Sequence, residues 1–251
     1  MAQIITCITE KGGVGKTSIL FNTSWELSKK KKILMIDLDG QEANLTYFCG
    51  VKKTDNMKTM FNVLVTGTEL KDTIVNVKEN LDLIPAKAEV SSLPENSSPG
   101  KFLKQLNTVT DNYDYIFIDV SPTPNKSHFI ALCVSDSVII PMLPDGASLK
   151  ALNGIAESIS EVKFANRNLK VLGILYNRNE GRTNLSREVK EITEKVAAEL
   201  ETTTFNTGIR QAVVLGENVM MHEGITDYAP KHPAADDYRS FIKEMEERIN
   251  E

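Results

Sequence analysis

The stretch KGGVGKTS, residues 11–18, decides the fold that this sequence can adopt. It follows the largely apolar run IITCI at residues 4–8 and opens a segment with the apolar spacing of a helix, so the order is buried strand, glycine turn, helix start. Its three glycines let consecutive backbone N–H groups turn inward on phosphate oxygens, and the helix start adds positive potential. Lys16 is then placed to reach the β- and γ-phosphates, and Thr17 to offer its hydroxyl to Mg²⁺. The stretch therefore predicts a nucleoside triphosphate site.

The spelling of this loop departs from the general phosphate-binding pattern, which requires a glycine where Glu10 stands. It fits instead KGGxGK[ST], with a second lysine at Lys11, and in this it resembles the ParA/MinD family of ATPases. The resemblance implies that Lys11 points across a dimer interface onto the phosphates of the ATP held by the other subunit, as an arginine finger does elsewhere. It also implies that the whole loop binds ATP, through Lys11, Gly12, Gly13, Val14, Gly15, Lys16, Thr17 and Ser18.

Length and composition narrow the class of protein. A chain of 251 residues with 41% apolar residues and a continuous alternation of strand and helix patterns predicts one α/β domain over residues 1–251. We expect a cytoplasmic protein, because no run reaches the roughly 18 apolar residues of a membrane span and the N-terminus lacks a signal-peptide pattern. The three cysteines are far apart, which indicates reduced core thiols, and the three histidines show no metal-ligand spacing.

A second buried strand is predicted at residues 33–36, where every residue is apolar. It delivers Asp37 and Asp39 to the carboxyl edge of the sheet, where doubly wound folds bind their ligands. The stretch DLDGQ resembles the second conserved box of the ParA/MinD family, with Gly40 where proline is commoner. The match implies that Asp39 orients the attacking water and that Asp37 belongs to the Mg²⁺ site, outside its direct ligands. Either aspartate could instead cap the next helix.

A third buried strand, residues 115–118, ends in Asp119. An aspartate after a buried strand is a weak signal alone, but together with the phosphate loop it predicts a carboxylate that accepts from Mg²⁺-bound water and from Thr17. The family usually continues with Asp-x-Pro-Pro, whereas Val120, Ser121 and Pro122 follow here. This departure concerns the conformation of the next loop rather than the metal site.

The remaining pattern completes a doubly wound, mostly parallel sheet of about seven or eight strands with helices on both faces, the P-loop NTPase class. The first helix is expected to reach the lysines at 29–32. Further expected elements are short helices at 56–67 and 69–77, strands at 81–84, 137–142 and 169–176, a surface connection at 90–100, a helix at 146–162 and a last helix from Pro233.

Two residues are expected on the base side of the nucleotide. The resemblance implies that Asn177, after the strand at 169–176, recognises the adenine edge, because an amide can both donate to and accept from the base; a loop-capping role is the alternative. Arg210 stands where relatives carry a Pro-Arg-Asn element that contacts nucleotide, with Gly208 and Ile209 in place of its proline.

The stretches at 181–189 and 227–245 resemble partition ATPases within the family. This implies slow ATP hydrolysis with Mg²⁺, carried by Lys11, Lys16 and Asp39, in a homodimer that forms with ATP. It further implies that the ATP dimer binds non-specific DNA, associates with the nucleoid, and is released when a ParB-type centromere-binding protein stimulates hydrolysis.

A net charge of −5 with 29 lysines and arginines requires that any DNA-binding charge be gathered locally. The resemblance points to the C-terminal basic residues, while a solvated helix face is the alternative for each. The candidates are Arg210, Lys231, Arg239 and Lys243, with Arg182, Arg187 and Lys190 as a second set.

Three other functions are alternatives for a chain of this family. A MinD-type ATPase that acts at membranes would need a basic amphipathic C-terminal helix, whereas this chain ends in FIKEMEERINE. A metallocluster-loading relative would need paired cysteines after Asp119, where Cys133 stands alone. An ATPase that positions a non-DNA cargo is separated from partition by no feature of the sequence.

Overall fold

The computed structural model describes residues 1–40, 44–95, 97–178 and 184–251, with side chains for all of these except residues 184–187. Its centre is a seven-stranded sheet in the order β3-β4-β2-β5-β1-β6-β7. All neighbouring strands are parallel except β3, which runs antiparallel to β4 at the edge. The strands are β1 Gln3–Cys7, β2 Ile33–Leu38, β3 Val75–Lys78, β4 Leu81–Ile84, β5 Tyr115–Val120, β6 Ser137–Met142 and β7 Lys170–Tyr176.

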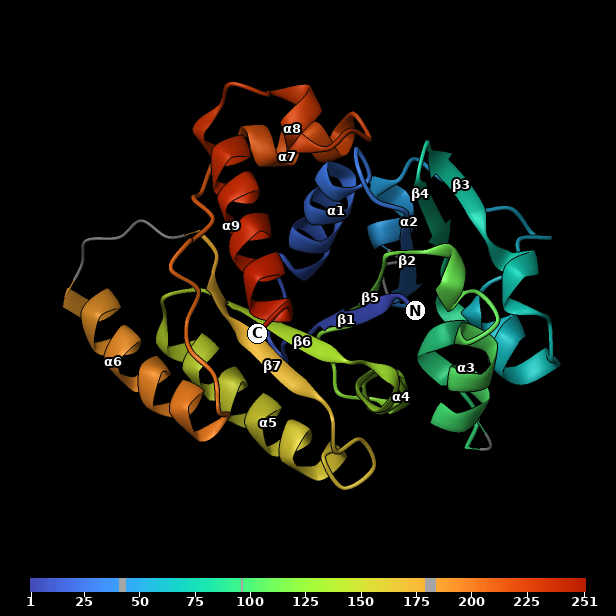
Figure 1. The fold of residues 1–251 in the computed structure, drawn as a ribbon, viewed down its shortest axis with the longest axis horizontal. Helices are drawn as coiled ribbons and strands as arrows, with labels where there is room; N and C mark the ends of the chain where they lie inside the picture. Colours follow the sequence, from blue (N-terminus) through green and yellow to red (C-terminus); the bar gives the residue numbers. More distant parts are fainter. Residues whose placement is uncertain (41–43, 96, 179–183) are drawn as a thin grey trace.

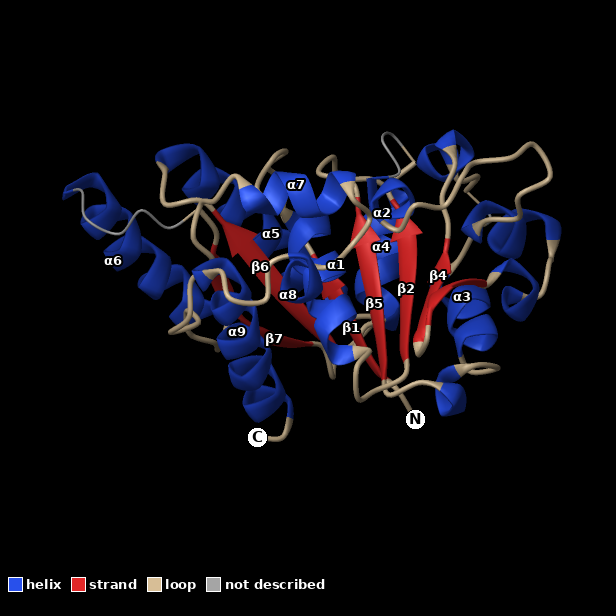
Figure 2. Ribbon diagram, turned by 90° about the horizontal axis from the view of Figure 1, so that it is seen from above, coloured by secondary structure: helices blue, strands red, loops and turns tan. Residues whose placement is uncertain are grey.

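Helices cover both faces of this sheet, which confirms the predicted doubly wound, mostly parallel class (Figures 1 and 2). One face packs against α3, α4, α5 and α6, and the other against α1, α2, α8 and α9. The helices are α1 Lys16–Leu27, α2 Asn44–Phe48, α3 Pro99–Leu106, α4 Lys126–Val134, α5 Gly146–Val162, α6 Asn184–Glu199, α7 Val214–Met220, α8 Ile225–Tyr228 and α9 Pro233–Ile249.

The two-sided core explains why the central strands are apolar at nearly every position. Neighbouring residues of a strand point to opposite faces, so Leu34 enters the core under α3 to α6, whereas Met35 enters the core under α1 and α9. Both are fully buried. The carboxyl ends of β1, β2 and β5 lie next to one another in the sheet, so the residues that follow them share one edge.

Several expected boundaries are wrong. The first helix ends at Leu27 instead of reaching residues 29–32, and β2 continues to Leu38, so that Asp37 lies inside the strand. In the segment 56–67 only Asn62–Thr66 forms a helix, of the π type, next to a short helical turn. These errors arise because propensity defines element ends poorly, whereas packing sets them.

The segment 69–77 contains the largest error. It forms a short 3₁₀ turn, Leu70–Thr73, and then the edge strand β3. Here Val75 and Val77 alternate with polar residues and are partly buried, as on a strand with one covered face. The predicted surface connection at 90–100 is half-buried or exposed over residues 91–95, but its ends differ, because Val90 is fully buried within a 3₁₀ turn and α3 begins at Pro99.

Candidate functional site

The phosphate loop connects β1 to α1 and forms one wall of a cavity of about 250 Å³. Gly13 and Gly15 adopt φ values of 71° and 95°, in the left-handed region that other residues avoid. Gly15 is also confined, because a Cβ there would collide with the side chain of Asn177. The cavity is lined by Gly12, Gly13, Gly15, Lys16, Thr17, Ser18, Asp39, Asn44, Phe48, Pro122 and Arg178.

Thr17 lines this cavity and contacts the buried Asp119. The Thr17 hydroxyl donates to Asp119 Oδ2 over 2.7 Å, while the other carboxylate oxygen, Oδ1, is buried with no hydrogen-bond partner among the described residues. A buried carboxylate oxygen without a partner, beside a hydroxyl, matches the oxygen ligands that Mg²⁺ prefers. The residues present therefore fit a bound Mg²⁺.

The charges around Asp119 also favour a bound cation. Asp37 is its register partner on β2, and both side chains are fully buried. Burial raises the pKa of Asp119 well above its usual value, and the charge of Asp37 raises it further, while Lys16 and the Thr17 hydroxyl act in the opposite direction. With Asp39 also lining the cavity, carboxylates outnumber ammonium groups here, so the site favours a cation or a proton.

Asp37 has a different set of contacts. Its Oδ1 accepts from the Asp39 N–H over 3.0 Å, and its Oδ2 accepts from the Thr46 N–H and hydroxyl over 2.9 and 2.7 Å. Burial raises the pKa of Asp37, and these hydrogen bonds oppose the rise. Asp37 thus ties the end of β2 to α2, which places Asp39, 4% exposed, against the cavity.

The two loop lysines point to different places. Lys16 is buried in the phosphate cavity, with its Nζ 3.5 Å from the carbonyl oxygen of Thr9. Lys11 does not line that cavity; its Nζ lies 2.6 and 2.8 Å from the carboxylate oxygens of Asp145, at the start of α5. The structure therefore separates two residues that lie five positions apart in one loop.

A second cavity, of about 400 Å³, adjoins the phosphate cavity and shares Gly15, Ser18, Phe48 and Arg178 with it. Asn177 lines this cavity, but its amide donates to the Val14 carbonyl over 2.6 Å and its Oδ1 accepts from the Arg178 N–H over 2.9 Å. One N–H and one lone pair of the amide remain for a base. The adenine contact of Asn177 stays a prediction.

Arg178 is a candidate that the sequence pattern did not assign. It lines both cavities, and its φ of 51° is unusual for a residue other than glycine. The sequence offers no signal for this conformation beyond the position directly after β7. Other lining residues that were not expected are Phe48, Leu215, Val219 and Tyr238.

The basic residues suggested for DNA are mostly engaged elsewhere. Arg210 lines the second cavity, but its guanidinium forms two hydrogen bonds of 2.6 and 2.7 Å with Asp237. Lys243 lies 3.9 Å from Glu247, and Lys231 is exposed. In the second set, Lys190 lies 5.6 Å from the ring centre of Tyr176. Arg182 and the side chain of Arg187 lie outside the described residues.

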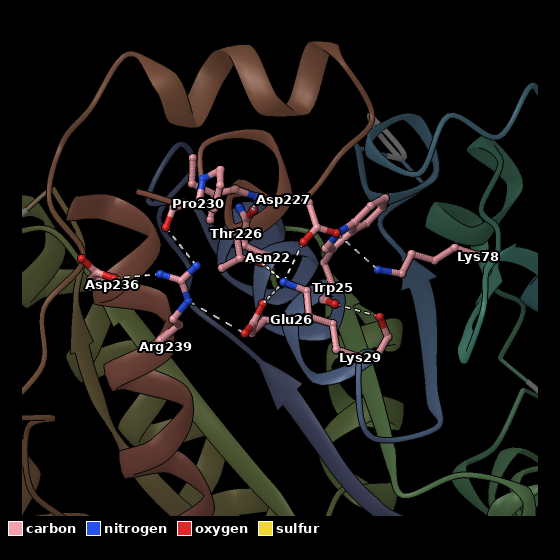
Figure 3. A network of polar contacts seen from close by, with 12 residues as sticks. Asn22, Trp25, Glu26, Lys29, Lys78, Thr226, Asp227, Pro230, Asp236 and Arg239 are labelled. Carbon is pink, nitrogen blue, oxygen red and sulfur yellow. Dashed lines mark hydrogen bonds and ion pairs between the residues drawn. The ribbon is translucent and has the colours of Figure 1, made fainter. Parts of the chain in front are cut away.

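Arg239 belongs to a network that joins α1 to α8 and α9 (Figure 3). It pairs with Asp236 over 2.7 Å and lies 4.0 Å from Glu26. On the other side of the network, Lys29 lies 2.6 Å from both Glu26 and Asp227. The network fixes α1, the helix that follows the phosphate loop, to the C-terminal segment. Arg239, a candidate for DNA contact, therefore already has acidic neighbours.

Within the described ranges, no helix combines the length and the apolar character needed to cross a membrane, and no group of histidine, cysteine and carboxylate side chains forms a metal cluster. A parallel sheet with a glycine loop after β1, and Thr17 beside Asp119 at its carboxyl edge, defines a P-loop NTPase.

Comparison with known proteins agrees. A protein-family profile described as an AAA domain matches residues 2–171. The sporulation initiation inhibitor protein Soj of Bacillus subtilis is 32% identical, over 98% of both chains. The chromosome-partitioning ATPase Soj of Thermus thermophilus is 28% identical, over 98% of this chain and 96% of that one.

Among solved structures, apo McdA of Cyanothece superposes with a TM-score of 0.88 at 19% identity, covering 98% of this chain and 99% of that one. A putative plasmid partition protein of Borrelia burgdorferi bound to AMPPNP gives a TM-score of 0.81 at 24% identity, covering 99% of this chain and 100% of that one. The chain belongs to the ParA/MinD family of P-loop ATPases, with its sequence relatives in the Soj/ParA branch.

Proposed function

We propose that this chain is a partition ATPase, in which Mg²⁺ and ATP close a sandwich dimer that binds non-specific DNA. A ParB-type partner stimulates hydrolysis and so releases the DNA. The observation that carries the proposal is the direction of Lys11, which points away from the phosphate cavity of its own chain. A lysine outside the phosphate cavity of its own chain does not contact its own nucleotide, and once released from Asp145 it can reach a nucleotide held by a second copy.

Within each subunit, the loop N–H groups and Lys16 hold the triphosphate, and Asp39 orients the attacking water. Thr17 and Asp119 would hold Mg²⁺, and Asp37 fixes Asp39 by accepting a hydrogen bond from its backbone N–H. Bound Mg²⁺ would neutralise charge that develops on the phosphates during transfer. The adjoining cavity, which Asn177 and Arg210 line, would receive the nucleoside. Residues 1–251 act as one domain, since both core layers share a single sheet.

The relatives support the biological setting. The Thermus thermophilus relative is named a chromosome-partitioning ATPase, and the Borrelia burgdorferi structure is titled a putative plasmid partition protein. We propose the same setting for this chain, in the cytoplasm and associated with the nucleoid when ATP is bound. Dimerisation would place two copies of one basic edge on the same side, which is how a chain with net charge −5 could bind DNA.

A second candidate is an ATPase that positions a non-DNA cargo by the same switch. The pairing of Arg210 with Asp237 and of Arg239 with Asp236 favours it, because each arginine already has an anionic partner. The identity of the protein that activates hydrolysis, captured by pull-down on the ATP-bound dimer, would distinguish the two.

The direct test is binding to two unrelated duplexes with ATP and with ADP over a salt series. Partition predicts equal affinity for both duplexes, a requirement for ATP, and a log–log salt slope of about −0.9 per neutralised phosphate. If the protein forms an ATP dimer but binds no duplex even at low salt, DNA is not its track and the non-DNA cargo takes its place.

A further inference from the structure

The ammonium group of Lys11 is fully engaged within its own chain. It donates to Asp145 Oδ2 over 2.6 Å, to Asp145 Oδ1 over 2.8 Å and to the Ser148 hydroxyl over 3.2 Å. A lysine ammonium has three N–H donors, so these three acceptors satisfy it. We call this group of Lys11, Asp145 and Ser148 the Lys11 clasp.

The acceptors are held rigidly by the start of α5. Asp145 is the N-cap residue of this helix, and its Oδ1 also accepts from the Ser148 N–H over 2.8 Å. Ser148 is 2% exposed, and its hydroxyl accepts from the Leu143 N–H over 3.2 Å. Burial acts to raise the pKa of Asp145, but the hydrogen bonds from Lys11 and Ser148 lower it overall, so the carboxylate stays charged at neutral pH.

The Lys11 clasp differs from an ordinary ion pair on the same helix. At the far end of α5, Lys163 makes one contact of 3.1 Å with Glu201, whose side chain is 81% exposed. In the clasp, the side chains of Lys11 and Asp145 are 23% and 39% exposed and share two contacts. The clasp is therefore the more specific and less hydrated interaction.

Lys11 cannot keep these contacts and also reach the phosphates of another subunit. We propose that Asp145 is a positioning residue that holds Lys11 on its own chain and thereby opposes dimerisation until a second, nucleotide-loaded copy offers a stronger anion. The inference rests on the proposed action of Lys11 in a dimer. The phosphates of a bound nucleotide carry more charge than a single carboxylate and can draw the lysine out of the clasp, so dimer formation depends on bound nucleotide.

The substitution Asp145→Asn tests this cleanly. Asparagine is as good an N-cap residue as aspartate, so α5 keeps its first hydrogen bond while the charge that holds Lys11 is removed. Partly exposed ion pairs change an equilibrium by about two- to fivefold, and a dimer opens two clasps, so we expect a dimerisation constant raised by about 4- to 25-fold. Glu201→Gln, which neutralises the ion pair at the other end of α5, is the matched control and should equal the wild type.

Dimerisation is measured by light scattering across a protein dilution series with saturating Mg²⁺ and AMPPNP, so that hydrolysis does not interfere. A tighter dimer for Asp145→Asn alone supports the proposal, and an unchanged or weaker dimer overturns it while leaving the wild-type dimer, and the proposed function, intact. If the wild type stays monomeric with AMPPNP, the proposed dimer is refuted, and the proposed role of the Lys11 clasp in dimerisation is refuted with it.

A second readout does not depend on the dimer. In nucleotide-free protein, the reaction of Lys11 with an amine-reactive acylating reagent is followed by mass spectrometry, with the exposed Lys231 as internal reference. The clasp predicts slow labelling of Lys11 in the wild type and labelling several-fold faster in Asp145→Asn. Equal labelling in the two proteins would show that Asp145 does not hold the lysine in solution.

Discussion

The side-chain amide of Asn177 donates a hydrogen bond of 2.6 Å to the backbone oxygen of Val14. The contact joins the end of β7 to the middle of the phosphate loop, across 163 positions of sequence. It also explains why Gly15 must lack a Cβ, since the amide occupies that space. The loop conformation thus depends on a strand far away in the chain.

The first prediction concerns Asn177→Ala. Loss of a buried hydrogen bond to the loop should weaken ATP and GTP binding by the same factor, about 3- to 10-fold, because the loop holds phosphates common to both. Calorimetric titration with each nucleotide measures this. A loss confined to ATP would instead assign Asn177 to the adenine edge, as the family resemblance implies.

Lys11→Ala should still bind ATP, because Lys11 does not line the phosphate cavity of its own chain. It should fail to form the ATP-dependent dimer and should hydrolyse ATP poorly. Light scattering and phosphate release measure the two effects, with Lys163→Ala as a control that removes a lysine remote from the phosphate loop. A variant that dimerises and keeps full turnover would refute the proposed role of the second lysine.

Asp39→Ala should separate binding from chemistry. The glycine loop, Lys16, Thr17 and Asp119 remain in place, so ATP binding persists, while loss of the residue that orients water slows hydrolysis by about a hundredfold or more. A stable ATP dimer should then accumulate, visible in light scattering. If calorimetry shows that ATP binding itself is lost, Asp39 supports the structure or the metal instead.

Lys16→Ala provides the contrast. Lys16 is buried in the phosphate cavity, so its removal takes away a charge-assisted contact to the phosphates and should weaken ATP binding by about 10- to 100-fold. Unchanged affinity in the same titration would place its ammonium away from the bound phosphates.

Proton release should accompany Mg²⁺ and ATP binding. Burial, the largest cause, and the neighbouring Asp37 raise the pKa of Asp119 to about 8, so the nucleotide-free protein holds a proton there at pH 7. A cation bound beside the carboxylate expels that proton, so affinity should rise with pH up to about 8 and then level off. Calorimetry in buffers of different ionisation enthalpy measures the released proton, and Asp119→Asn should abolish the buffer dependence.

The same shift makes the nucleotide-free protein less stable as pH rises. An unfolded aspartate titrates at about 4, so between about 4 and 8 the folded state holds more protons than the unfolded state, and the free energy of unfolding falls with increasing pH. Urea unfolding of wild type and Asp119→Asn over this range measures it. If the difference in the free energy of unfolding between the two proteins does not change with pH, the raised pKa of Asp119 is contradicted.

The sequence alone determined the class of the fold and predicted which strand ends carry the candidate site. Strands buried on two faces must be apolar at successive positions, and a loop that wraps phosphate must carry glycines at fixed places. Both features can therefore be predicted from residues that are adjacent in the sequence. The position of Asp119 at the carboxyl edge was predicted because it directly follows the apolar run at residues 115–118. The structure confirms the sheet class and brings Thr17 and Asp119 together.

Tertiary structure decided what depends on residues distant in the chain. Whether residues 69–77 form a helix or the edge strand β3 depended on the side that β4 offered for pairing. Nothing near Lys11 in the sequence indicates Asp145, and nothing near Arg210 indicates that Asp237 would bind it. These pairings exist only because the sheet order brings β1, β6 and β7 side by side and the last helix folds back over them, and contacts of that range leave no local pattern.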